Sequence, residues 1–207
     1  MSGAGTIYLV DDEPGMLKAL SRLLGAAGFA VTGFLSASDF LANFPENAIG
    51  CLVLDVAMPG LDGMELQQRL NESGNPLPVI FLTGHGDIPM SVRAIKSGAV
   101  DFLTKPVHDE KLLAAVRMAM KLSEARAAEK AASAGLRERL DRLTPRELDV
   151  MRQVITGKLN KQIAADLGTG EQNIKIHRMR MMEKMGAESV VELARLAERL
   201  GVEPAEH

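Results

Sequence analysis

The stretch Ile7-Tyr8-Leu9-Val10-Asp11-Asp12-Glu13-Pro14 decides the fold. Four apolar residues are followed at once by three carboxylates and a proline. A short, continuously apolar run is typical of a strand that is buried on both faces of a parallel sheet. A proline directly after acidic residues is typical of the first turn of a helix. The stretch therefore predicts a strand at residues 7–10 whose carboxyl end carries acidic side chains and leads into a helix.

The same alternation of a short apolar run and a helical pattern continues to residue 106. Four more strands are predicted, at residues 30–34, 51–54, 79–82 and 100–103. Helix-spaced apolar residues follow each strand, and the last helix begins near Glu110. Strand and helix alternating five times predict a five-stranded, doubly wound α/β domain of the flavodoxin-like type. Ligands of such domains bind just beyond the carboxyl ends of the strands.

A long helix connects this domain to the carboxyl-terminal third of the chain. Residues 109–134 contain neither proline nor glycine and are rich in strong helix formers, so we expect a continuous helix of about 26 residues with Gly135 as its stop or hinge. Its apolar residues give way to alanine after Leu122, which favours a solvated connector over a coiled coil. We assign residues 1–121 to the first domain, 122–140 to a helical linker and 141–207 to a second domain.

The second domain is predicted to be all-helical. Thr144-Pro145-Arg146-Glu147 has the pattern of a capped helix start, and that helix is expected to end at Gly157. Three more helices are predicted: residues 161–167 capped by Asn160, residues 171–185 stopped by Gly186, and residues 189–200 with Ser189 and Glu192 as a capping box. Short helices joined by a glycine-containing turn predict a helix-turn-helix.

Charge and composition exclude several protein classes. The chain has 207 residues and a net charge of −3, but the first 120 residues carry −5 and residues 137–184 carry +4. A single cysteine, Cys51, inside an apolar run excludes a disulfide framework and a cysteine–histidine metal cluster, and it predicts a small buried residue in an intracellular protein. No export signal or membrane span is recognisable, so we expect a cytoplasmic protein without a membrane partner.

Polar residues follow four of the predicted strands, and the fold would bring them to one edge of the sheet. They are Asp11 and Asp12, Asp55, Thr83, and Lys105. Three carboxylates close together repel by several kcal/mol at an effective dielectric near 20, so they need a cation. Lys105 supplies one positive charge, and a hard, oxygen-seeking Mg²⁺ would supply two. We expect Asp12 and Asp55 to hold the metal directly, Asp11 through coordinated water, and Ala57 through its backbone carbonyl.

This set of residues suits phosphoryl transfer. Asp55 is the candidate nucleophile, and Thr83 with Lys105 would hold the phosphoryl oxygens. Taken singly, each aspartate is more simply explained as a turn or cap residue, and the Asp11–Pro14 run could serve only to cap the first helix. Together, five matching positions at the ends of the strands are hard to ascribe to capping.

Several longer motifs resemble a known family. Asp11-Asp12, Asp55-Val56-Ala57-Met58-Pro59-Gly60, Thr83-Gly84-His85-Gly86-Asp87 and Asp101-Phe102-Leu103-Thr104-Lys105-Pro106 resemble receiver domains of two-component response regulators. Leu143-Thr144-Pro145-Arg146-Glu147-Leu148 and Gly157-Lys158-Leu159-Asn160-Lys161-Gln162-Ile163-Ala164 resemble the LuxR-type helix-turn-helix. Together they are similar to the FixJ branch of the FixJ/NarL family.

The resemblance implies a transcription regulator rather than an enzyme. Asp55 would accept a phosphoryl group from a sensor histidine kinase, with Mg²⁺ or Mn²⁺ required, and Thr83 with Phe102 would form the switch pair. The face built from the fourth helix, fifth strand and fifth helix would then form a homodimer, with Val92 and Lys96 at matching positions. The dimer would bind promoter DNA.

Helix 171–185 is the candidate DNA-reading helix. Helical spacing turns Ile174, His177 or Met181, and Met185 inward. This leaves for the DNA groove Gln172, Lys175, Ile176, Arg178 and Met179, of which Lys175, Ile176 and Met179 match base-contacting positions of the family. Lys158, Lys161 and Arg178 are expected to contact phosphates.

Two other functions remain open from the sequence. Haloacid-dehalogenase-like phosphatases also phosphorylate an aspartate, but they need a general acid two residues later, where this chain has Ala57. Alternatively, the receiver could be regulated by partner binding or constitutive dimerisation without phosphorylation.

Overall fold

The chain folds into two compact units, residues 1–128 and 129–207, which are described separately. The computed structural model describes residues 5–45, 48–74, 77–84 and 88–205. The motif that begins at Thr83 therefore lies partly outside the described residues, at 85–87, as does the start of the N-terminal segment, at 1–4. Across the described residues, no helix is both long enough and apolar enough to cross a membrane.

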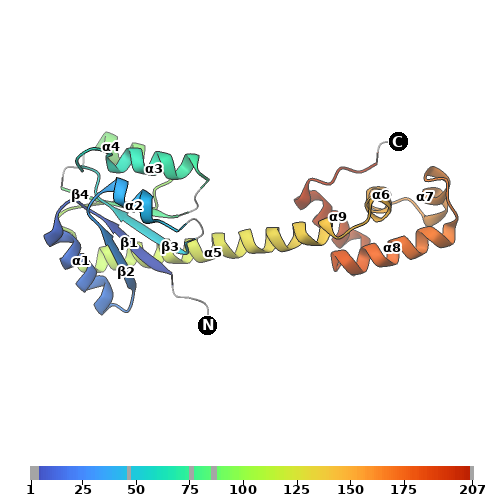
Figure 1. The fold of residues 1–207 in the computed structure, drawn as a ribbon, viewed down its shortest axis with the longest axis horizontal. Helices are drawn as coiled ribbons and strands as arrows, with labels where there is room; N and C mark the ends of the chain where they lie inside the picture. The colour runs from blue at the N-terminus through green and yellow to red at the C-terminus, as the bar shows by residue number, and fades with distance from the viewer. Residues whose placement is uncertain (1–4, 46–47, 75–76, 85–87, 206–207) are drawn as a thin grey trace. The chain divides into compact units, whose positions relative to one another are not determined.

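The first unit is built on a five-stranded parallel sheet (Figure 1). Its strands are β1 (Thr6–Val10), β2 (Ala30–Phe34), β3 (Gly50–Leu54), β4 (Val79–Thr83) and β5 (Asp101–Thr104). Their order is β2-β1-β3-β4-β5, which places β1, β3 and β4 in the interior of the sheet. Almost every residue of these three strands is buried, as expected for continuous apolar runs covered on both faces, and the predicted doubly wound fold is confirmed.

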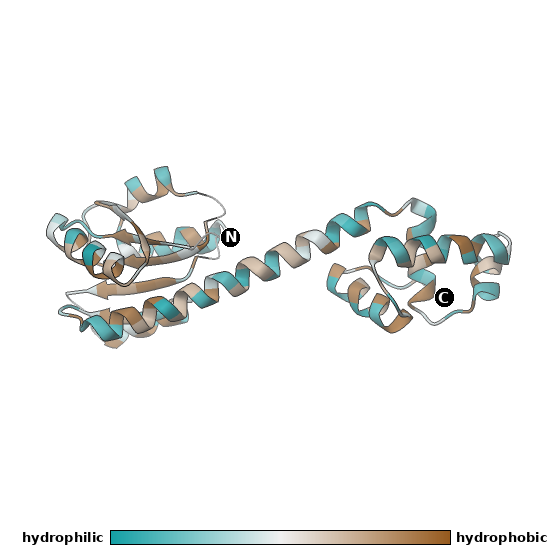
Figure 2. Cartoon of the chain, turned by 90° about the horizontal axis from the view of Figure 1, so that it is seen from below, coloured by the Kyte–Doolittle hydropathy of each residue, from teal (hydrophilic) through white to brown (hydrophobic). Residues whose placement is uncertain are grey.

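Alternate side chains of the strands pack against helices on opposite faces of the sheet. Ile7 and Leu9 of β1 pack with α1 (Pro14–Ala26) and α5 (Asp109–Asp141). Tyr8 and Val10 pack with the other three helices, α2 (Ala37–Asn43), α3 (Gly63–Glu72) and α4 (Ile88–Lys96). Figures 1 and 2 show this layering, with apolar colour along the strands. Helices on both faces leave the strand ends as the accessible edge.

The single cysteine is a buried residue of the sheet, as predicted. Cys51 lies in β3 with none of its surface exposed. Burial raises the pKa of its thiol to about 12. At neutral pH it is therefore a protonated, apolar side chain.

The long helix α5 passes through the glycine that was expected to end it. α5 spans Asp109–Asp141, so the prediction of a stop at Gly135 is wrong. A glycine in a helix interior costs about 1 kcal/mol relative to alanine. The next residue, Leu136, is only 8% exposed and belongs to the apolar core of the second unit. Burial of a leucine contributes about 1.5–3 kcal/mol, which is enough to keep the helix continuous through the glycine.

The second unit contains the end of α5 and four further helices. These are α6 (Pro145–Val154), α7 (Asn160–Asp166), α8 (Glu171–Met185) and α9 (Val190–Leu200). At the start of α6, the predicted capping box is present: the Glu147 N–H donates to Thr144 Oγ1, and the Thr144 N–H donates to Glu147 Oε2. The helix ends at Val154, three residues before the predicted Gly157. The four helices otherwise match the prediction closely.

Two predicted helix starts differ in detail. Asn160 is the first residue of α7 and not its cap; the preceding Leu159 N–H donates instead to Gln162 Oε1, at 2.8 Å. At α9, Ser189 Oγ accepts from the Glu192 N–H as expected, but the Glu192 carboxylate accepts from the Glu188 N–H. The predicted side-chain caps are therefore only partly formed at these two helix starts.

An ion pair between a buried carboxylate and a half-buried lysine links α6 to α8. Glu147 is 2% exposed, and Lys184 Nζ lies 2.6 Å from its Oε2. Burial raises the pKa of the Glu147 carboxyl, but hydrogen bonds from Lys184 and Thr144 outweigh burial, and the pKa lies below its usual value. Folding therefore favours the carboxylate form. Its contribution to the free energy of unfolding is fully present above the usual carboxyl pKa and is lost as the pH falls through the lower pKa of the folded state.

We predict that Glu147→Gln lowers the free energy of unfolding of the second unit by about 2 kcal/mol at pH 7, because it removes the charge that pairs with Lys184. The difference from wild type should shrink as the pH falls below 4.5, the usual carboxyl value. Hydrogen exchange of the α6 and α8 amides in the full chain measures this difference in the free energy of unfolding. Glu183→Gln, which removes an exposed charge on α8, is the control. A pH-independent difference would contradict the assignment.

Candidate functional site

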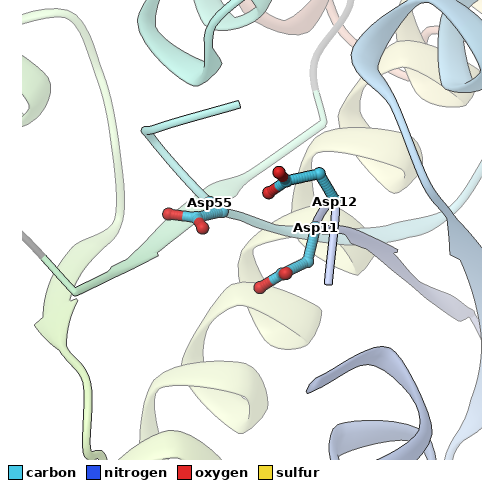
Figure 3. Close-up of side chains that lie close together, drawn as sticks. All are labelled: Asp11, Asp12 and Asp55. Atoms are coloured by element: carbon cyan, nitrogen blue, oxygen red, sulfur yellow. The ribbon is translucent and has the colours of Figure 1, made fainter. Parts of the chain in front are cut away.

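The strand register brings Asp11 and Asp55 to one edge of the sheet. Val10 pairs with Leu54, so each aspartate is the first residue beyond a paired strand end. The Asp55 N–H continues the ladder by donating to the Val10 carbonyl at 2.9 Å. Figure 3 shows Asp11, Asp12 and Asp55 gathered at this edge. The three carboxylates predicted to converge therefore do so.

Each of these three residues offers a carboxylate oxygen within 4.8 Å of the other two. Asp11 is 3% exposed and Asp55 is 6% exposed, whereas Asp12 is more open to solvent. Asp11 Oδ1 accepts from the Glu13 N–H at 2.9 Å, and Asp55 Oδ1 accepts from the Ala57 N–H at 3.3 Å. These backbone donors fix the direction of the two buried carboxylates.

Lys105 lies between the buried aspartates. Its Nζ is 2.6 Å from Asp11 Oδ2 and 2.9 Å from Asp55 Oδ2. The Lys105 N–H donates to the carbonyl of Thr83, and the Lys105–Pro106 peptide bond is cis. Burial lowers the pKa of the ammonium, but hydrogen bonds and charge from the two aspartates more than offset it and raise the pKa above that of a free lysine. Lys105 is therefore cationic at neutral pH.

The donor set fits a hard divalent cation. Three carboxylates and one ammonium leave a formal charge of −2 in a small, partly buried volume. Carboxylate and carbonyl oxygens are the ligands that Mg²⁺ prefers, and Mg²⁺ commonly keeps several waters when only a few carboxylates bind it. The open position of Asp12 leaves room for such waters. The cluster is thus compatible with the predicted Mg²⁺.

Gly63, at the start of α3, is a residue of the site that the sequence reasoning missed. A Cβ at this position would lie 2.2 Å from the Asp55 carbonyl oxygen and 3.0 Å from the Val56 Cα. Only glycine allows the helix to approach the segment that carries Asp55. The sequence feature that could have indicated this residue is the Asp62-Gly63 pair. Asp62 is the N-cap of α3, and its side chain accepts a hydrogen bond from the Glu65 N–H.

Thr83 and Phe102 lie on neighbouring strands close to this edge. Thr83 ends β4 and is fully buried, and it pairs in register with Thr104 of β5. Phe102, two residues earlier on β5, is half-buried, with its ring 6.0 Å from that of Phe81. The structure therefore places the predicted pair near each other, with Phe102 between the apolar interior and solvent.

The candidate DNA-reading helix α8 has a buried side and an exposed side, as predicted. Ile174, Met181 and Met185 are fully buried, so Met181 rather than His177 takes the innermost place. The exposed side carries Gln172, Lys175, Ile176 and Met179, and Met179 is 62% exposed. The exposed side of α8 therefore combines apolar and cationic side chains.

The remaining three predicted contacts differ among themselves. Lys161 is exposed, but Lys158 forms an ion pair with Asp166 at 2.8 Å. Arg178 is half-buried and donates from Nη1 to Asn160 Oδ1 at 2.9 Å. This bond ties α7 to α8 and explains why the Asn160 side chain does not act as a cap.

Helix α4 exposes an apolar row. Ile88, Val92 and Ile95 are separated by one turn each and are all exposed, and Lys96 follows them at the end of the helix. Three large exposed apolar side chains on one helix face are typical of an interaction surface. Both predicted interface residues, Val92 and Lys96, are accessible on this helix.

Comparison with known proteins matches both units. The response regulator receiver domain family covers residues 7–117, and the family of bacterial regulatory proteins of the luxR type covers residues 141–197. The chain is 45% identical over 197 residues to the response regulator protein TodT of Pseudomonas putida, covering 95% of this chain and 87% of TodT. It is 43% identical over 202 residues to the transcriptional regulatory protein FixJ of Bradyrhizobium diazoefficiens, covering 98% of both.

Solved structures agree with these relatives. The response regulator StyR has a TM-score of 0.87 at 41% identity, covering 94% of this chain and 98% of StyR. Full-length FixJ from B. japonicum has a TM-score of 0.58 at 44% identity, covering 95% of this chain and 97% of FixJ. With a receiver fold followed by a LuxR-type DNA-binding unit, the chain belongs to the FixJ/NarL family of two-component response regulators.

Proposed function

We propose that this regulator is switched on by phosphorylation of Asp55. Residues 1–121 would be the receiver, 122–140 the linker, whose last two turns pack on the second unit, and 141–207 the DNA-binding domain. The observation that carries the proposal is the position of the Asp55 carboxylate, at the edge of the sheet beside two other aspartates and 2.9 Å from Lys105 Nζ. The donor would be a phosphohistidine of a sensor kinase in the cytoplasm.

Phosphoryl transfer at this site needs a nucleophile and charge neutralisation. An Asp55 carboxylate oxygen would attack phosphorus as the phosphorus–nitrogen bond of the donor histidine breaks, giving an aspartyl phosphate and a free histidine. Lys105 Nζ and the Thr83 hydroxyl would hold the phosphoryl oxygens. Mg²⁺ or Mn²⁺ would supply the remaining positive charge. The metal would be bound directly by Asp12 and Asp55, by the Ala57 carbonyl, and through a water molecule by Asp11.

The residue type two positions after Asp55 supports a lasting modification rather than an enzyme. The residue two positions after Asp55 is Ala57, whose side chain cannot donate a proton to a leaving group or activate water. The phosphoryl group would therefore persist long enough to act as a signal. This favours a regulator over a phosphatase of general specificity.

A phosphoryl group at Asp55 would change the neighbouring surface. The aspartyl phosphate carries a charge of about −1.5 to −2 and three strong acceptor oxygens, where the carboxylate carried −1. Movement of the Thr83 side chain towards it would open space that the half-buried Phe102 ring can enter. The apolar row on α4, with Val92 and Lys96, adjoins β5 in the same unit and would form the dimer interface.

The DNA contacts would divide into two kinds. Lys175, Ile176 and Met179, all exposed on α8, would contact bases, and Gln172 would lie at the edge of the groove. Lys161 would contact phosphates. Lys158 would do so while releasing or sharing its partner Asp166, and Arg178 while releasing or sharing Asn160. A dimer would present two such helices to promoter DNA.

We predict that acetyl phosphate with Mg²⁺ adds one phosphoryl group to the wild-type chain, because a small donor can reach the open edge of the sheet. Intact-mass measurement checks this. Asp55→Asn should gain none, chelation of the metal should prevent the gain, and Asp39→Asn, an exposed aspartate on α2, should behave as wild type.

An unmodified wild-type chain would contradict phosphorylation and support regulation by partner binding or constitutive dimerisation. Steady hydrolysis of a generic phosphomonoester that disappears in Asp55→Asn would instead indicate a phosphatase.

We predict different salt behaviour for two lysine variants. Lys175→Ala should weaken binding to a duplex selected from a random pool more than binding to a scrambled duplex, by about 1–3 kcal/mol. Lys161→Ala should weaken both equally and reduce the salt slope by about one. Fluorescence anisotropy over a range of salt concentrations measures both. Equal losses on the two duplexes for Lys175→Ala would contradict its role as a base reader.

A further inference from the structure

The carboxyl ends of α5 and α8 are bound to each other in the second unit. The last turn of any helix leaves backbone carbonyls without partners inside the helix. Here each helix supplies a cationic side chain to the carbonyl end of the other. Arg139 Nη1 of α5 donates to the carbonyl of Met185, the last residue of α8, at 3.2 Å. Lys184 Nζ of α8 donates to the carbonyl of Arg142, just after α5, at 3.1 Å.

The end of α8 is shaped to receive Arg139. Gly186, the residue after α8, has φ +65°, a left-handed conformation that terminates the helix. A Cβ on Gly186 would lie 2.9 Å from Arg139 Nη1, so a side chain there would displace the guanidinium. The glycine therefore serves two purposes, the helix stop and the space for Arg139.

Apolar packing holds the same segment of α5 against the second unit. Leu136 is 8% exposed, and Leu140 packs against the same core, which also contains Ile174, Met181 and Met185 of α8. The last two turns of α5 thus form part of the DNA-binding core. Arg139 adds a directional contact to this packing, because a hydrogen bond constrains orientation whereas apolar packing allows sliding.

We propose that Arg139 is a positioning residue for sequence-specific DNA binding: it holds the carboxyl end of α8 so that the exposed side chains of α8 meet bases at a fixed angle. This inference rests on the DNA contacts proposed for α8. Base contacts depend on angle and distance, while phosphate contacts tolerate small rotations. Loss of the bond therefore affects discrimination between sequences more than overall affinity.

The test uses the full chain and a duplex that the wild-type chain selects from a random pool, with a scrambled duplex as reference. Arg139→Met keeps most of the apolar stem but removes every donor, Arg139→Lys keeps one cationic donor nitrogen, and Arg137→Met removes an exposed charge two residues away on α5. Anisotropy titrations over a range of salt concentrations give the ratio of the two affinities and the salt slope. Hydrogen exchange of α8 reports whether each variant remains folded.

We expect Arg139→Met to lower the affinity ratio about fivefold, the equivalent of one ordinary hydrogen bond, with an unchanged salt slope. Arg139→Lys should recover most of the ratio, and Arg137→Met should match wild type. An unchanged ratio in Arg139→Met overturns the inference. A salt slope smaller by about one with equal losses on both duplexes also overturns it, since Arg139 would then contact phosphate directly.

If hydrogen exchange shows that α8 unfolds in Arg139→Met, Arg139→Lys becomes the deciding variant. An Arg139→Lys chain that is folded but has an affinity ratio well below that of wild type overturns the inference. A wild-type chain that selects no duplex even after treatment with acetyl phosphate and Mg²⁺ overturns the proposed DNA contacts and this inference with them.

Discussion

The ion pairs that Lys105 makes with Asp11 and Asp55 are the interaction on which the site depends. Two carboxylate charges about 4 Å apart repel by roughly 4 kcal/mol at an effective dielectric of 20, and this site holds three such charges. One ammonium compensates part of that charge and holds two of the carboxylates from the end of a different strand. The remaining negative charge leaves this edge compatible with a bound divalent cation, and it disfavours a phosphate that arrives without one.

The sheet and the site were predictable because their signals are local. The apolar runs fixed which strands lie inside, and polar residues placed just after those runs necessarily meet at the carboxyl edge of a parallel sheet. The approach of Gly63 to the Asp55 carbonyl was not predictable in this way. It depends on how α3 packs beside β3, which no spacing along the chain encodes.

The second unit shows the same limit. Helical spacing found the buried side of α8, but it assigned Asn160 as a cap when Arg178, 18 residues later in the sequence, takes its side-chain oxygen. Likewise, helix propensity placed a stop at Gly135, whereas burial of Leu136 and the bond from Arg139 to α8 favour a helix that continues. Contacts between elements outweighed local preference in both cases.

The two units therefore divide the work of a response regulator, and α5 contributes residues to both. An acidic unit holds a site suited to a phosphoryl group, and a unit with a local cationic excess presents a helix suited to DNA. The most direct test is the affinity of the full chain for a selected duplex before and after treatment with acetyl phosphate and Mg²⁺, with sedimentation velocity under the same conditions. Phosphorylation should raise the affinity of the wild-type chain about tenfold and convert it to a dimer, while Asp55→Asn stays unchanged. Equal affinity in both states of the wild type, or an equal response in Asp55→Asn, would contradict a switch at Asp55.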